Sequence, residues 1–195
     1  KYIYEFVVFF SLFIYRWITC IAPSPISGLI NSIRFSRNMY IIPWGVNNEY
    51  IKYPITDSNY KYHLTFLGRA NSQKLNLIQL EDIINIILKS KIINKKSDLN
   101  ISFVMPKFNK HSKYIVNYLK KYYNLNIDIY IGKNNKQIRS ILSETLYYFN
   151  CYEWEAFGLS YIESLCMGCN VLLPITSPIL PIIDHINDSP VFKFT

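Results

Sequence analysis

Short apolar runs alternate with amphipathic stretches from residue 63 to the end of the chain. The short runs have the length and composition of buried strands. In the longer stretches apolar residues recur every three or four positions, as on one face of a helix. This pattern predicts strands at 63–68, 100–105, 127–132, 145–150, 170–175 and 191–194, and helices at 77–90, 110–123, 136–144, 158–168 and 179–187. Such an alternation with tight connections indicates one α/β domain, a doubly wound parallel sheet covered by helices.

The first 42 residues have a different pattern. Residues 2–22 are very apolar and predict a buried helix followed by a strand at 18–22. A membrane-associated helix is the alternative, but Arg16 interrupts the apolar run, whose uninterrupted part is about half of the roughly 20 residues that a membrane span needs. A helix opened by Pro25 and a strand at 39–42 follow, and Pro43 then begins a linker. Because four elements make a poor independent domain, we expect this region to be the tail of a preceding one, in a chain that begins at Lys1 rather than at Met.

Charge and composition narrow the classes of partner. Half of the residues are apolar, which is enough to bury a substantial core. The net charge of +8 indicates either an anionic partner or simple overuse of lysine, and under either interpretation it gives a weak attraction to an anionic membrane surface. A basic nucleic-acid-binding domain is a rival interpretation. The lysines, however, are scattered and form no basic face interleaved with aromatic residues, so we expect no nucleic-acid partner.

Cys166 and Cys169 form a single C-x-x-C motif, which in other proteins marks a redox or metal site. A closed zinc site needs four ligands, and only His185 of the three histidines lies nearby in sequence. We therefore expect buried thiols here and no metal.

Two cations follow the first strand of the alternating pattern, in the stretch "LGRANSQK". Gly68 allows a sharp turn, and Arg69 and Lys74 follow it closely. An arginine can contact two phosphate oxygens at once and a lysine acts as a point charge, so the pair suits a diphosphate at the carboxyl edge of the sheet. On this stretch alone, ordinary solvated loop charges are the alternative.

A second stretch, "EAFGLSYIES", lies at the same edge of the predicted sheet. Its Phe157-Gly158-Leu159 segment opens a helix, where free backbone N–H groups favour an anion and glycine permits a close approach. Glu155 and Glu163 flank this segment with seven residues between them, and carboxylates accept hydrogen bonds from sugar hydroxyls. Alternatively, Glu155 only stabilises the helix N-terminus and Glu163 is a solvated helix residue.

Taken together and in this order, the two stretches resemble the C-terminal domain of GT-B glycosyltransferases, in particular the large retaining family called group 1 or GT4. That family carries a strand ending in Gly-Arg, a following Lys and an "EGFGLPxLEAMACGxPV" segment, which here reads "EAFGLSYIESLCMGCNV" at 155–171. The stretch "IIPWGVNNEYI" is similar to the "IPNGVD" linker of the family. The resemblance covers nearly the whole chain.

The resemblance implies a Rossmann-like fold, the C-terminal half of a GT-B enzyme. Residues 1–45 would be the tail of an acceptor domain with part of the linker, and residues 46–195 the nucleotide-sugar-binding domain. It implies transfer from a nucleotide-diphospho-sugar to a carbohydrate or lipid-linked acceptor with retention, without metal or cofactor, in the cytoplasm and at the inner membrane surface. The catalytic residues would be Arg69, Lys74 and Glu155, and the donor-binding residues Gly68, Gly132, Phe157, Gly158, Leu159 and Glu163.

Several positions depart from the family pattern. Ala156 stands for the usual glycine and Ser160 for the usual proline. "FVMPKF" replaces a Gly-rich loop, and "TSPILPII" replaces a "GGxxEI" segment, which leaves the donor open. Because most of the acceptor domain is missing, we expect donor binding without efficient turnover. A non-catalytic nucleotide-sugar-binding or scaffolding domain of the same fold is the alternative.

Overall fold

The computed structural model describes residues 20–22, 25–35, 39–42, 44–50, 60–89, 98–151, 157–174, 177, 180 and 191–194. The chain divides into two compact units, residues 1–45 and residues 46–195. Of the elements predicted from the sequence, the first helix in residues 2–17 lies outside the described residues. Of the helix at 179–187, only Leu180 is described. No helix within the described part of the chain has the length and apolar character that a membrane crossing requires.

The first unit contains a small β-α-β arrangement. The strands β1 (Cys20–Ala22) and β2 (Met39–Ile41) pair in parallel, and the helix α2 (Pro25–Phe35) connects them. Gly28 of α2 lies against Ile41 so closely that a Cβ atom would overlap its side chain. A larger residue at this position would require the end of the Ile41 side chain to move.

The second unit is built on a six-stranded sheet in the order β5-β4-β3-β6-β7-β8, in which all neighbours are parallel. The six predicted strands are confirmed, each within one residue at its start. When the strands of this unit are numbered one to six along the chain, their order across the sheet is 3-2-1-4-5-6, which is the order of a doubly wound fold. The strands are β3 (Tyr62–Leu67), β4 (Asn100–Met105), β5 (Asn126–Ile131), β6 (Thr145–Phe149), β7 (Asn170–Pro174) and β8 (Val191–Phe194).

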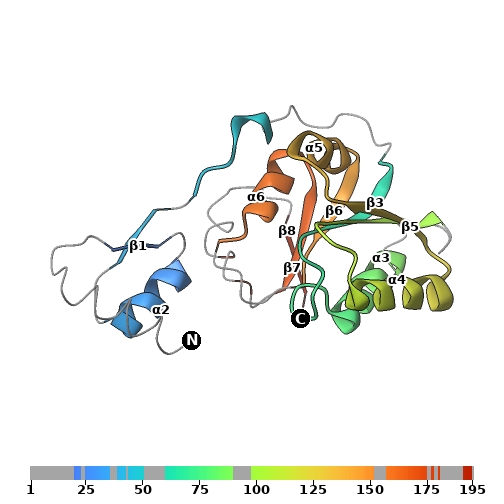
Figure 1. The fold of residues 1–195 in the computed structure, drawn as a ribbon, viewed down its shortest axis with the longest axis horizontal. Helices are drawn as coiled ribbons and strands as arrows, with labels where there is room; N and C mark the ends of the chain where they lie inside the picture. The colour runs from blue at the N-terminus through green and yellow to red at the C-terminus, as the bar shows by residue number, and fades with distance from the viewer. Residues whose placement is uncertain are drawn as a thin grey trace. The chain divides into compact units, whose positions relative to one another are not determined.

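Helices cover both faces of this sheet (Figure 1). The helices α3 (Leu77–Lys89) and α4 (Lys110–Tyr123) lie on one face, and α5 (Asn135–Ser143) and α6 (Leu159–Cys166) on the other. Under α3 and α4 the fully buried rings of Phe66, Phe103 and Phe149 pack with centroids 5.8–6.4 Å apart. Under α6 the rings of Tyr148 and Tyr161 pack edge to face at 5.3 Å. The apolar stripes predicted for these helices therefore face the sheet.

Two of the helices begin with the same cap. Asn109 caps α4 and Asn134 caps α5, and each side chain accepts a hydrogen bond from the backbone N–H three residues later. In both cases the third residue of the helix bonds back to the N–H of the cap, which completes a capping box. The box is completed by the buried Ser112 in α4 and by the exposed Gln137 in α5, and Asn109 makes a further contact at the candidate site.

Candidate functional site

The sheet has one point at which its strand order reverses. The chain passes outward from β3 to β4 and β5 and then returns to β6 on the other side of β3. Connections that leave β3 and β6 pass to opposite faces of such a sheet, so ligands are expected in a crevice beyond the carboxyl ends of these two strands. Gly68 and Arg69 follow β3, and Asn150 and Cys151 follow β6 and lead toward Phe157. The structure thus brings both of the predicted stretches to the switch point.

The loop after β3 is a compact turn. The backbone carbonyl of Asn71 accepts hydrogen bonds from the N–H groups of Lys74 and Leu75, at 3.1 and 2.9 Å. The Asn71 side-chain oxygen accepts from the same Lys74 N–H at 2.9 Å. These bonds fix the backbone of the loop that carries the two predicted cations, of which Arg69 is exposed and Lys74 is half-buried.

Neighbouring elements hold this loop from two sides. The side-chain amide of Asn109 donates to the carbonyl of Ala70 at 2.9 Å, and His111 of α4 is 2.8 Å from the carbonyl of Leu75. From the other side of the switch point, the N–H of Cys151 donates to the carbonyl of Lys74 at 3.3 Å. The cations are therefore carried on a loop that is anchored at both neighbouring strand ends.

The start of α6 is the second wall of the crevice. Gly158 occupies the N-cap in the left-handed conformation, with φ 76° and ψ 52°, which glycine adopts at little cost. No side chain caps the helix, and the N–H of Tyr161 in its first turn donates to the carbonyl of Gly158 at 2.9 Å. Phe157 and Gly158 are buried and Leu159 is half-buried.

Two tyrosines hold α6 on the sheet. The Tyr148 hydroxyl donates to the Ser160 hydroxyl at 2.8 Å and lies 3.4 Å from the carbonyl of Leu67 at the end of β3. The Tyr161 hydroxyl donates to the carbonyl of Asn150 at 3.2 Å. Ser160, one of the departures from the family pattern, thus supplies an acceptor that proline lacks.

Glu163 is a half-buried carboxyl on α6. Burial raises its pKa, and within the described residues no basic side chain pairs with it. Its charge contributes to the raised pKa of Tyr50, after the larger effect of burial, which places it near the short helix η1 (Asn48–Tyr50). An unpaired, half-buried carboxylate is costly for folding and is a frequent feature of binding sites.

A pocket of about 280 Å³ lies beyond the ends of β3, β4 and β5. The backbone N–H groups of Gly68 and Gly132 extend the sheet, donating to the carbonyls of Val104 and Met105, each at 3.0 Å. Gly132 has φ 61°, a conformation that strains other residues. The structure therefore brings Gly68 and Gly132, 64 positions apart in sequence, to one pocket. Its lining is formed by Leu67, Gly68, Val104, Met105, Pro106, Gly132, Lys133 and Ile138.

No family model and no curated protein sequence matches the chain. Solved structures do. TarM aligns over 90% of this chain with 14% sequence identity and a TM-score of 0.64. WaaG, a glycosyltransferase involved in lipopolysaccharide biosynthesis, aligns over 89% of this chain with 12% sequence identity and a TM-score of 0.63. The C-terminal domain of a group 1 glycosyl transferase, LpcC from Francisella tularensis, aligns over 77% of this chain with 18% sequence identity and a TM-score of 0.57.

The chain has a GT-B glycosyltransferase fold. It covers 80% of the LpcC domain, but only 33% of TarM and 48% of WaaG, and it corresponds to the C-terminal half of such enzymes. At these identities the likeness establishes the fold alone, while glycosyl transfer, the donor, the acceptor and the residues that act belong to the proposal below.

In this GT-B fold most of the predicted site residues lie at the switch point. Arg69 and Lys74 lie on the β3 side, Phe157, Gly158 and Leu159 at the start of α6, and Glu163 further along that helix. Glu155 lies outside the described residues. Among the described residues there is no group of three or more His, Cys, Asp or Glu side chains that could hold a metal ion. The Cys169 thiol of the C-x-x-C motif is buried and donates to the carbonyl of Leu142, and burial raises its pKa to about 12.

Sequence reasoning missed several residues that shape the site. Asn109 and His111 lie near the start of α4, yet they anchor the loop after β3. Their capping pattern was visible in the sequence, but their partners 36 to 39 positions away were not. Lys133 lines the pocket of about 280 Å³ and could have been predicted from the sequence, because it directly follows the predicted site residue Gly132.

Proposed function

We propose that this chain is the donor-binding part of a retaining glycosyltransferase. It would bind a nucleotide-diphospho-sugar and transfer the sugar to a carbohydrate or lipid-linked acceptor. The observation that supports the proposal is the strand order, whose switch point brings together the end of β3, with its anchored cationic loop, and the end of β6, after which α6 begins with the N-cap Gly158. Two independent features that favour anions converge there.

The diphosphate would lie in this crevice. Arg69 and Lys74 would contact its oxygens from one side, and the backbone N–H groups of the 157–159 segment from the other. Negative charge builds up on the leaving nucleoside diphosphate during transfer, so fixed positive charge at this place would stabilise the transition state without a metal. Removing one such donor in other enzymes lowers kcat by about 10²- to 10³-fold.

The nucleoside would extend toward the pocket of about 280 Å³. Its mainly apolar walls and the absence of side chains at Gly68 and Gly132 suit a flat base. Glu163 would accept hydrogen bonds from the ribose hydroxyls, which would compensate its burial. Glu155 would contact the transferred sugar.

The acceptor and the stereochemistry rest on other support. Retention follows the resemblance to the group 1 family, and a carbohydrate or lipid-linked acceptor agrees with the lipopolysaccharide pathway in which WaaG takes part. A cytoplasmic location and contact with an anionic membrane surface stay predictions from the resemblance and from the net charge.

Calorimetric titration of the chain with UDP, GDP and ADP tests the proposal. We expect one nucleotide to bind, with affinity reduced about tenfold by Arg69→Ala, as for the loss of one charge-assisted contact. Lys120→Ala is the matched control, because this exposed cation lies at the far end of α4, away from the carboxyl edge. Binding of none of the three nucleotides, or equal losses in the two variants, would contradict a donor site here.

A transfer assay separates the catalytic proposal from the non-catalytic alternative. Nucleotide binding together with hydrolysis of the matching nucleotide sugar supports an enzyme. Binding with neither hydrolysis nor transfer, in a protein that also carries the acceptor domain, would favour a nucleotide-sugar-binding or scaffolding role.

A further inference from the structure

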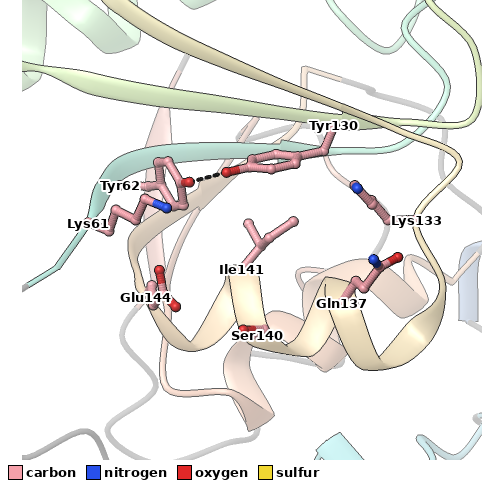
Figure 2. Close-up of a pocket in the computed structure, with 8 residues that line it drawn as sticks. All are labelled: Lys61, Tyr62, Tyr130, Lys133, Gln137, Ser140, Ile141 and Glu144. Carbon is pink, nitrogen blue, oxygen red and sulfur yellow. Dashed lines mark hydrogen bonds between the residues drawn. The ribbon is translucent and has the colours of Figure 1, made fainter.

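A second pocket, of about 240 Å³, lies on the other side of Lys133 from the pocket described above. It runs along α5, between this helix and the strands β3 and β5 (Figure 2). At one end are Lys61 and Glu144, and at the other Lys133 and Gln137. Nothing in the proposed donor site uses this space. Its lining consists of Lys61, Tyr62, Tyr130, Lys133, Gln137, Ser140, Ile141 and Glu144.

Two tyrosines form a fixed wall of this pocket. The side chain of Tyr62 is buried, its hydroxyl donates to Asp128 at 3.0 Å, and it is hydrogen-bonded to the hydroxyl of Tyr130. The two rings meet edge to face with centroids 6.1 Å apart. Both phenol protons are thus engaged within the wall. Tyr130, which is half-buried, therefore offers ring surface to a ligand beside the buried Ile141, and Tyr62 holds this ring in place from behind.

The lining carries an excess of positive charge. Its charged members are two lysines and one glutamate, so the net charge is +1. The ammonium of Lys61 lies 5.1 Å from the ring centroid of Tyr62, and that of Lys133 lies 5.8 Å from that of Tyr130. Both cations therefore lie within cation–π range of the tyrosine rings, with Lys61 exposed and Lys133 half-buried.

The neutral polar groups complete the pattern. Gln137 and Ser140 of α5 line the pocket opposite the tyrosines, and both can donate to and accept from hydroxyl groups. The volume lies below the range of about 300–1,000 Å³ that is usual for drug-sized ligands. A suitable occupant is therefore compact, negatively charged at one group and rich in hydroxyls elsewhere.

We propose that this pocket binds a monosaccharide phosphate. The phosphate contacts a lysine, the hydroxyls contact Gln137, Ser140 and Glu144, and one face of the sugar packs on the Tyr130 ring. Lys133 lines both pockets and directly follows Gly132, so an occupant that draws Lys133 to itself changes the wall of the first pocket. Any such effect on nucleotide affinity must be reciprocal.

The probes for this site are glucose 6-phosphate, glucose 1-phosphate, glucose and inorganic phosphate, each titrated calorimetrically into the chain. We expect at least one sugar phosphate to bind at least about fivefold more tightly than either glucose or inorganic phosphate. Lys61→Gln should weaken it about fivefold, the effect of one partly exposed ionic contact. Lys136→Gln is the matched control, because Lys136 is an exposed lysine on α5 that does not line the pocket.

Three results would overturn the site: no binding of either sugar phosphate, binding no tighter than that of inorganic phosphate, or equal effects of the two substitutions. Circular dichroism of both variants verifies that they fold. Nucleotide titrations in parallel separate this site from the donor site, because Lys61→Gln should leave nucleotide affinity unchanged and Arg69→Ala should leave sugar-phosphate affinity unchanged.

Discussion

The anchoring of the cationic loop can be measured through Asn109→Ala. This side chain does two things at once: its oxygen caps α4 by accepting from the Ser112 N–H at 2.9 Å, and its amide donates to the carbonyl of Ala70 at 2.9 Å. Loss of an N-cap costs about 1 kcal/mol, and loss of one intramolecular hydrogen bond about 1 kcal/mol. We therefore expect Asn109→Ala to lower the free energy of unfolding by about 2 kcal/mol.

Asn134→Ala provides the control. Asn134 caps α5 with the same capping box, accepting from the Gln137 N–H at 3.0 Å, and is exposed. Its substitution should remove only the cap and lower the free energy of unfolding by about 1 kcal/mol. The difference between the two variants isolates the bond to Ala70, and denaturation in urea measures both. In a chain of this length the losses correspond to about 4–8 °C and about 2–4 °C in Tm, respectively.

Equal losses in the two variants would refute the reasoning, because Asn109 would then act only as a cap. A functional readout adds a second check. Asn109→Ala should weaken nucleotide binding through a looser loop, whereas Asn109→Asp, which keeps the cap but loses the amide donor, should restore stability in part and nucleotide affinity little.

Three further predictions concern single side chains. Glu163→Gln should raise Tm at pH 7 and change it little at pH 4. Burial raises the pKa of the Glu163 carboxyl in the folded chain, so the protonated carboxyl contributes stability below the unfolded pKa, and this stability is lost as pH rises through the folded pKa. An equal effect at both pH values would contradict this. Tyr148→Phe should lower stability by about 1 kcal/mol in thermal unfolding, because the hydroxyl bond to Ser160 is lost while the ring packing remains, and an unchanged Tm would show that this bond contributes nothing. Cys151, whose pKa burial raises to about 12, should react with iodoacetamide at pH 8 far more slowly than the half-exposed Cys166, as followed by peptide mass spectrometry; equal rates would argue against its burial.

The sequence was sufficient to predict the strands and helices of the second unit, because their apolar periods are regular. The run "NISFVM" has one interior polar residue, Ser102, and becomes a strand that is buried from Ile101 to Met105, while the stripe of α3 places Leu80, Ile83, Ile84 and Ile87 on the sheet. Helix ends were the least accurate: α6 ends at Cys166, two residues before the predicted limit, because Met167 and Gly168 form a turn instead.

Contacts between distant segments could not be read from the sequence. Periodicity gives each strand its faces but not its neighbours, so the order that places β3 beside β6 became visible only in the fold. The bond of Tyr62 to Asp128 spans 66 positions, and neither residue stands out in the sequence. The two loops at the switch point were predicted because each follows a predicted strand and matches a family pattern, whereas the tyrosine wall of the second pocket depends on distant contacts and was not predicted.

The most direct test of the central claim is an NMR titration of the chain with the nucleoside diphosphate that binds it. Glycine amides resonate apart from most others, and three of them mark the proposed site: Gly68, Gly132 and Gly158. The account predicts that these three shift together and saturate at one Kd, while Gly45 of the first unit does not move. Shifts confined to other residues, with these three unchanged, would contradict a donor site at the switch point.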